Sequence, residues 1–202
     1  MRRAKDESAR ALPPVPWRQL LGPIVVTLFG GIAFYTLVVE LSYALTAVGV
    51  TSVGTIGLVS AVASAATAIG ALTFPRVAHR GPGTLLPVAF AAIGIGLAVV
   101  AAGSTVTVIL VGAVIAGYGQ GLLLPSLLTW TISSLSLEQR GRGTGLWTAA
   151  IFLGEFICPL VVLALTAALS GLSPALLVLG IACLVVAIAV RVVRPTRRVA
   201  AD

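Results

Sequence analysis

Apolar residues fill three long segments of the chain, and charged residues are confined almost entirely to the stretches between them. The segments are 19–75, where the only charge is Glu40, 81–137, which has none, and 143–190, where the only charge is Glu155. A helix that crosses a bilayer needs about 20 apolar residues. Each segment is 48 to 57 residues long and therefore predicts two membrane-spanning helices joined by a short uncharged turn.

This pattern predicts an all-α membrane protein with six transmembrane helices. Strands are excluded because the apolar runs lack the alternation of a barrel, and open strands would leave backbone groups unpaired in hydrocarbon. A six-helix bundle over residues 20–193 would lie between a basic leader, residues 1–19, and a tail, residues 194–202. We expect the spans at Leu20–Thr46, Val53–Phe74, Thr84–Ala102, Thr105–Thr131, Gly143–Leu169 and Pro174–Val193.

Composition supports an integral, multi-pass membrane protein. Of the 202 residues, 58% are hydrophobic and only 9% are charged, against roughly 25% charged residues in a soluble domain. A net charge of +7 would suggest nucleic acid as the partner of a soluble protein. Here the lipid bilayer is the expected partner and nucleic acid is not, because the basic residues act as topology signals.

The basic residues all fall on one side of the predicted bundle. Five of the 13 precede the first span, two lie between the second and third, two lie between the fourth and fifth, and four lie at or beyond the end of the sixth. The turns on the other side carry no charge. Loops rich in Arg and Lys stay in the cytoplasm, so we expect both termini to be cytoplasmic and the protein to lie in the inner or cell membrane.

Glu155 and Glu40 are the two acidic residues expected inside the membrane, where a charge costs a few kcal/mol. Glu155 lies twelve residues into the fifth span, about 18 Å from its cytoplasmic end. Burial without a cationic partner favours a protonated carboxyl group, so Glu155 is a candidate for a proton-titrating or cation-binding residue, or else for a packing residue. Glu40, nearer the outer end of the first span, could reach the interface or face an external vestibule.

Gln120 and Pro125 are the other notable residues of the fourth span. The Gln120 amide could bind a substrate or a neighbouring helix, of which the second is more common. Pro125 removes one backbone hydrogen bond and predicts a kink.

Two GxxxG pairs predict close approach between helices. The first pair is Gly117 and Gly121 in the fourth span, and the second is Gly141 and Gly145 beside the polar segment SLEQRGRG, residues 136–143, which we expect to be a hinge.

Signatures of enzymes and metal centres are missing from the sequence. It contains no GxSxG, HExxH or GxxxxGK[ST] motif, and His79 is the sole histidine. We therefore expect no catalytic residues, no metal site and no cofactor. Cys158 and Cys183 lie in apolar runs, where a thiol is usually a small core residue.

Three segments resemble the carboxy-terminal half of a major facilitator superfamily transporter. GYGQGLLLPSLLTW, residues 117–130, is similar to the tenth helix of that family, and RGRGTGLWTAAIFLGEFICPL, residues 140–160, is similar to the start of the eleventh. FYTLVVELSYALTAVGVTSVGTIGLVSA, residues 34–61, resembles helix seven running into helix eight. Residues 70–80, GALTFPRVAHR, depart from the family's loop motif because they lack its Asp.

The resemblance implies half of a secondary transporter, of the drug-exporter-like permeases. Its cavity would be lined by the first, fourth and fifth spans, Glu155 would couple transport to protons, and small hydrophobic or cationic compounds would be exported. Transport would need a second six-helix half, supplied by another copy of the chain or by another protein. The alternative is a membrane protein that does not transport, either a packing or regulatory partner of a larger complex or an inert gene remnant.

Overall fold

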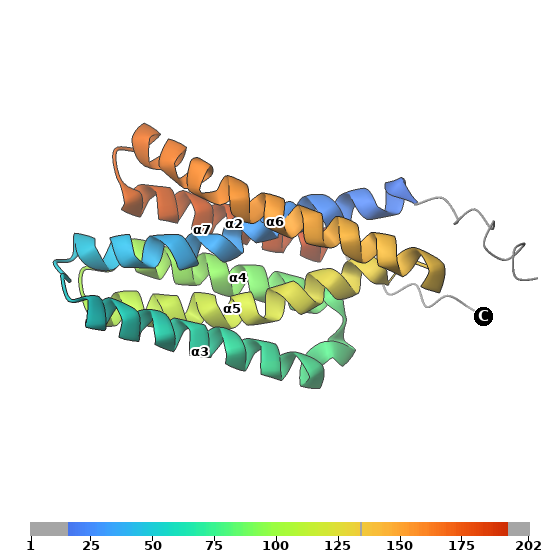
Figure 1. The fold of residues 1–202 in the computed structure, drawn as a ribbon, viewed down its shortest axis with the longest axis horizontal. Coiled ribbons are helices and arrows are strands. Elements are labelled where there is room, and N and C mark those ends of the chain that lie inside the picture. The colour runs from blue at the N-terminus through green and yellow to red at the C-terminus, as the bar shows by residue number, and fades with distance from the viewer. Residues whose placement is uncertain (1–15, 134, 194–202) are drawn as a thin grey trace, which may run out of the picture.

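Six long apolar helices make up the computed structural model, which describes residues 16–133 and 135–193 (Figure 1). Each is long and apolar enough to cross a bilayer, and no strand occurs in the described ranges, which confirms the predicted fold class. The helices are α2 Trp17–Ala47, α3 Val53–Val77, α4 Pro82–Ala101, α5 Val106–Ile132, α6 Leu137–Ala168 and α7 Leu172–Val193, and a short 3-10 helix, η1 Ala78–Arg80, follows α3. Most of the predicted leader and the whole predicted tail lie outside the described residues.

Polar side chains cap the first turns of several helices, where backbone N–H groups have no partner within the helix. The Ser52 and Thr105 hydroxyls accept hydrogen bonds from the first turns of α3 and α5. At the start of α6, Ser136 and Gln139 form a capping box in which the Ser136 amide donates to Gln139 Oε1 at 3.3 Å. The polar segment 136–143, expected to be a hinge, is therefore helical from Leu137 onward, because its own side chains stabilise that helix end.

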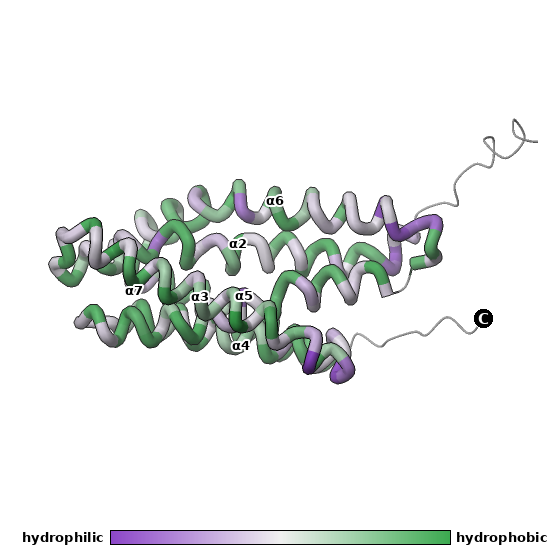
Figure 2. The backbone as a smooth tube through the Cα atoms, turned by 60° about the horizontal axis from the view of Figure 1, so that its bottom comes forward, coloured by the Kyte–Doolittle hydropathy of each residue, from purple (hydrophilic) through white to green (hydrophobic). Residues whose placement is uncertain are grey.

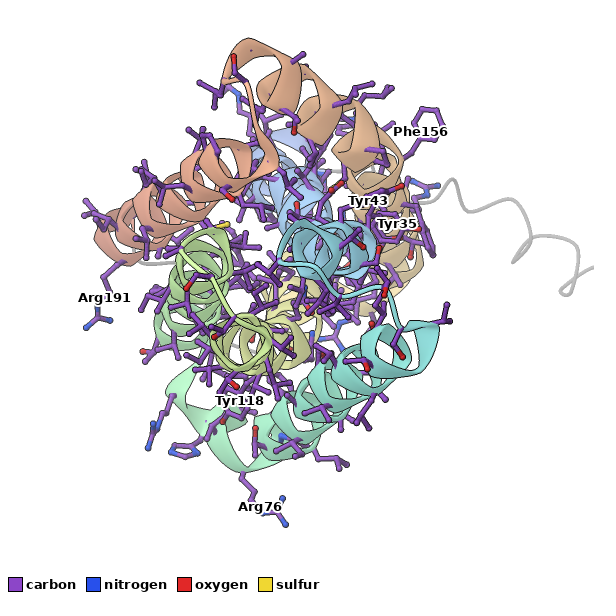
Figure 3. The ribbon with its side chains drawn as sticks, turned by 90° about the vertical axis from the view of Figure 1, so that its left-hand side faces the viewer. Tyr35, Tyr43, Arg76, Tyr118, Phe156 and Arg191 are labelled. Carbon is purple, nitrogen blue, oxygen red and sulfur yellow. The ribbon has the colours of Figure 1, made fainter. Side chains whose placement is uncertain are left out.

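Helix α2 lies between α3 and α6 on one side of the bundle. It packs mainly on α6 and also on α5, while α5 packs on α3 and α4, and α4 packs on α7. Seen from the end of the bundle, α6, α2 and α3 follow one another down one side (Figure 3). Helices α3 and α6 are the two least buried of the six.

Glycines lie at the crossing of each of the four closest helix pairs. A Cβ atom added to any of them would come too close to the backbone of the facing helix, so each crossing depends on the missing side chain. The facing glycines are Gly31 and Gly154 for α2–α6, Gly70 and Gly121 for α3–α5, Gly96 and Gly112 for α4–α5, and Gly94 and Gly180 for α4–α7.

Polar residues gather at one end of the bundle (Figure 2). The described part of α2 begins at this end and the described part of α7 finishes there (Figure 1). The arginines of the described ranges sit at the helix ends on this side, and they are Arg18, Arg76, Arg80, Arg140, Arg142 and Arg191.

Candidate functional site

One side of α2 is open along the half of the helix farther from the arginines, and two cavities flank this open side. We call this surface, formed by Tyr35, Val38, Val39 and Tyr43, the α2 face. Val38 is 59% exposed and Tyr43 is 62% exposed. Tyr35 and Tyr43 lie on the same side of α2, towards α6 (Figure 3). The α2 face is the candidate site because helices on both sides of it contribute to the two cavities.

The first cavity, the Gln120 cavity, lies between α2, α3 and α5 and measures about 220 Å³. Hydroxyl groups from α3 and the amide of Gln120 make one wall of it polar, whereas the α2 wall is apolar. Its lining residues are Phe34, Leu37, Val38, Leu41, Ser60, Ala63, Ser64, Thr67 and Gln120.

Gln120 ties three helices together at this cavity. Its Nε2 donates to the Phe34 carbonyl of α2 at 2.7 Å, and its Oε1 accepts from Thr67 Oγ1 of α3 at 3.5 Å. The side chain is 3% exposed. Both ends of the amide therefore bond to neighbouring helices, and contact between helices is the more common of the two roles expected for Gln120. The side chain also lines the cavity.

The second cavity, the Glu40 cavity, lies on the other side of the α2 face, between α2 and α6, and measures about 470 Å³. Apolar side chains form most of its wall. Its lining residues are Val39, Glu40, Tyr43, Pro159, Val162, Leu163, Thr166 and Leu172.

Among the described residues, Glu40 is the only acidic or basic residue on the wall of this cavity. It is 9% exposed. Within residues 16–133 and 135–193, its carboxyl group has neither a hydrogen-bond partner nor an ion-pair partner. A carboxyl group in so apolar a place without a partner is costly, which marks it as a functional candidate.

Glu155 lies at the crossing of α2 and α6. A Cβ on Gly31 of α2 would lie 3.1 Å from the Glu155 backbone nitrogen. The Glu155 side chain is half-buried and belongs to the lining of neither cavity. Pro159 has no amide hydrogen and so cannot donate to the Glu155 carbonyl four residues earlier.

The two acidic residues follow one another along the seam between α2 and α6. Gly31 faces Gly154, and Thr36 Oγ1 lies 3.5 Å from Cys158 Sγ one turn further along. Glu40 then shares a cavity with the next turns of α6. Because later residues of α2 meet later residues of α6, the two helices run parallel. Glu40 lies nine residues beyond Gly31 on α2, about 13 Å along the helix. Glu155 is thus near the middle of the bundle, and Glu40 is towards the end opposite the arginines.

The glycines and the proline predicted to shape helix contacts lie in different surroundings. Gly117 and Gly121 face α3, where a Cβ on Gly117 would lie 2.6 Å from the Ala63 carbonyl oxygen. Pro125 lies inside α5, which continues to Ile132.

Gly141 and Gly145 have no atom of another segment within 4 Å of a Cβ position. No helix of the described part of the chain lies against that face of α6, so close approach at these two glycines stays a prediction.

Sequence reasoning missed the hydroxyl groups of α3 that line the Gln120 cavity. Ser60, Ser64 and Thr67 recur at a helical spacing in a segment that is otherwise rich in alanine and glycine. That spacing places them on one face and could have identified it. The described ranges contain no group of three or more His, Cys, Asp or Glu residues that could hold a metal ion.

Comparison with known families matches nearly the whole chain. The sequence model of the family described as Major Facilitator Superfamily matches residues 19–202. No curated protein matches the sequence. The matched range includes all six helices apart from the first two residues of α2, so the α2 face and both cavities lie within the part of the chain that resembles the family.

Proposed function

Because the chain belongs to the major facilitator superfamily, a class of membrane transporters rather than enzymes, we propose that it forms one half of a solute pathway. The observation that carries the proposal is the α2 face, open on one side and flanked by the Gln120 and Glu40 cavities. Substrate sites of secondary transporters lie near the middle of the membrane, between two repeats that move relative to each other. The α2 face would form this chain's wall of such a site.

A second six-helix unit is required on this side of the molecule. Helix α3 has small residues on its exposed surface, among them Gly57, Ala61 and Ala68. A Cβ on Gly57 would meet no atom within 4 Å, as is also true of Gly141 and Gly145 on α6. Small residues let helices of a partner approach closely. Another copy of this chain, or a different six-helix protein, would cover α3 and α6 and close the pathway over the α2 face.

Glu155 is the residue that we assign to proton coupling. It sits near the middle of α6, 13 residues before the helix ends at Ala168. Intramembrane acids near the midplane commonly act as proton relays in transporters. The missing hydrogen bond at its backbone carbonyl, caused by Pro159, adds a second polar group at the same level of the membrane.

The substrates that fit this lining are small hydrophobic or cationic compounds, which the protein would export. Apart from Glu40, the described residues that line the two cavities include no acidic or basic side chain, and most of the walls are apolar. Sugars and phosphates need a larger number of polar contacts than these walls provide. The arginines at one end of the bundle favour an orientation in which both termini are cytoplasmic and the protein lies in the cell membrane.

Reconstitution into liposomes tests this function. The protein, extracted with any partner that remains bound, should move neutral and cationic dyes when a pH gradient is imposed. Glu155→Gln should abolish the response to the gradient while leaving downhill dye exchange. Gradient-driven transport that persists in Glu155→Gln would contradict the coupling role, and a complete lack of dye movement in the wild type would contradict the transporter itself.

A further inference from the structure

We propose that the Glu40 cavity binds a monovalent organic ammonium or phosphonium ion, with Glu40 as the counter-ion and Tyr43 as an aromatic wall. The proposal rests on the function proposed above, because it names the class of substrate that one of the two cavities takes. It gives the two intramembrane acids different roles, since Glu40 would bind the positive charge of the substrate and Glu155 would bind and release the proton.

The carboxyl group of Glu40 makes the cavity selective for cations. Within residues 16–133 and 135–193 it is the only acidic or basic residue on the wall, and these residues offer it no hydrogen bond or ion pair. A carboxylate in these surroundings is poorly solvated, so a ligand that brings a single positive charge relieves the cost of its burial. An anionic ligand would be repelled, and a ligand with two positive charges would bury one of them without a partner.

The remainder of the wall favours an organic ion over a metal ion. Metal ions need several oxygen ligands, but Thr166 and Tyr43 are the only side chains besides Glu40 that bring an oxygen to this cavity. The other side chains, such as Val162 and Leu163, are apolar and reward the burial of hydrocarbon. The Tyr43 ring can in addition stack against a cation.

The volume of the cavity fits a small molecule. At about 470 Å³ it lies within the range of roughly 300 to 1,000 Å³ that is usual for ligand pockets. Glu40 lies about 13 Å along α2 from the level of Glu155, estimated from the helical rise. Glu155 does not line this cavity, so proton coupling is assigned to a residue outside the proposed binding site.

Equilibrium binding of tetraphenylphosphonium to the full-length chain in nanodiscs of neutral phosphatidylcholine tests the proposal. Neutral lipid avoids unspecific accumulation of the cation at the surface. We expect saturable binding that Glu40→Gln weakens at least tenfold and that Glu40→Asp weakens less. Glu138→Gln, the matched control, removes an exposed carboxyl group at the start of α6 that lines neither cavity, and it should bind within threefold of the wild type. Triphenylphosphine oxide, which is uncharged, should bind equally to the wild type and to Glu40→Gln.

Equal affinity of tetraphenylphosphonium for the wild type and Glu40→Gln would overturn the proposal, as would an equal loss in Glu138→Gln. If melting curves show that Glu40→Gln does not fold, Tyr43→Leu replaces it, with an expected severalfold loss against unchanged binding in Tyr43→Phe. Binding that depends on Glu40, without gradient-driven transport of any dye, would support the site and contradict the transporter. Transport of neutral dyes, together with tetraphenylphosphonium binding that is unchanged in Glu40→Gln, would support the transporter and contradict the site.

Discussion

Gly31 of α2 and Gly154 of α6 face each other at the point where these two helices cross. A Cβ on Gly154 would lie 3.0 Å from the Gly31 Cα, and it would also collide with the Leu28 carbonyl oxygen. This contact fixes the seam on which Glu155 and Glu40 lie. The position of Glu155 on α6 relative to Glu40 on α2 therefore depends on these two glycines.

Gly154→Ala should destabilise the protein, because the added methyl group forces α2 and α6 apart. Overpacking of this kind costs about 1–3 kcal/mol. Thermal unfolding in nanodiscs should show a lower melting temperature. Gly22→Ala on α2 is the control, since a Cβ there meets no atom within 4 Å, and it should unfold at the wild-type temperature or slightly above. Equal melting temperatures for the two variants would contradict the close crossing.

Gln120→Leu should also lower stability, because it removes the hydrogen bonds that join α5 to Phe34 and Thr67. Hydrogen bonds between membrane helices contribute about 0.5–2 kcal/mol. Thr67→Val, which removes only the longer of the two bonds, should have the smaller effect in the same melting experiment. A Gln120→Leu protein as stable as the wild type would show that the amide does not join the helices.

Ala68→Trp on α3 should disrupt pairing with the second six-helix unit, because it places a large side chain on the surface that the partner covers. Light scattering behind a sizing column, with the detergent subtracted, would measure the protein mass of the extracted complex. Ala189→Trp on α7, also exposed, should leave that mass unchanged. If both variants keep the wild-type mass, then the partner does not cover α3.

The sequence was sufficient to predict the six helices, because stretches of about 20 apolar residues separated by arginines leave few alternatives in a membrane. It was less informative at residues 136–143. Glycines and charges there suggested a hinge, but the capping box of Ser136 and Gln139 makes the segment helical. A side-chain interaction of this kind outweighs the local tendency of glycine to end a helix.

Contacts between helices could not be predicted from the glycine spacing. GxxxG pairs occur at residues 117–121 and 141–145, but only the first lies against another helix of the described chain. Gly31 and Gly154, which do meet, belong to no such pair in the predicted set. The spacing shows that a helix has a small face, whereas the packing of the other five helices decides what that face meets. Glu155 and Glu40 were identified by their charge, but the cavity beside Glu40 required the structure.

Labelling of single cysteines by a membrane-impermeant thiol reagent tests most directly whether the α2 face lines a pathway for solutes. Val38 and Ile181 are similarly exposed, at 59% and 52%, and each lies nine residues from the end of its helix opposite the arginines. Cys158 and Cys183 are fully buried and would be replaced by serine. We expect Val38→Cys to react at least tenfold faster than Ile181→Cys, because water reaches a solute pathway but not a lipid-facing thiol. Equal rates at the two positions would contradict a pathway along α2.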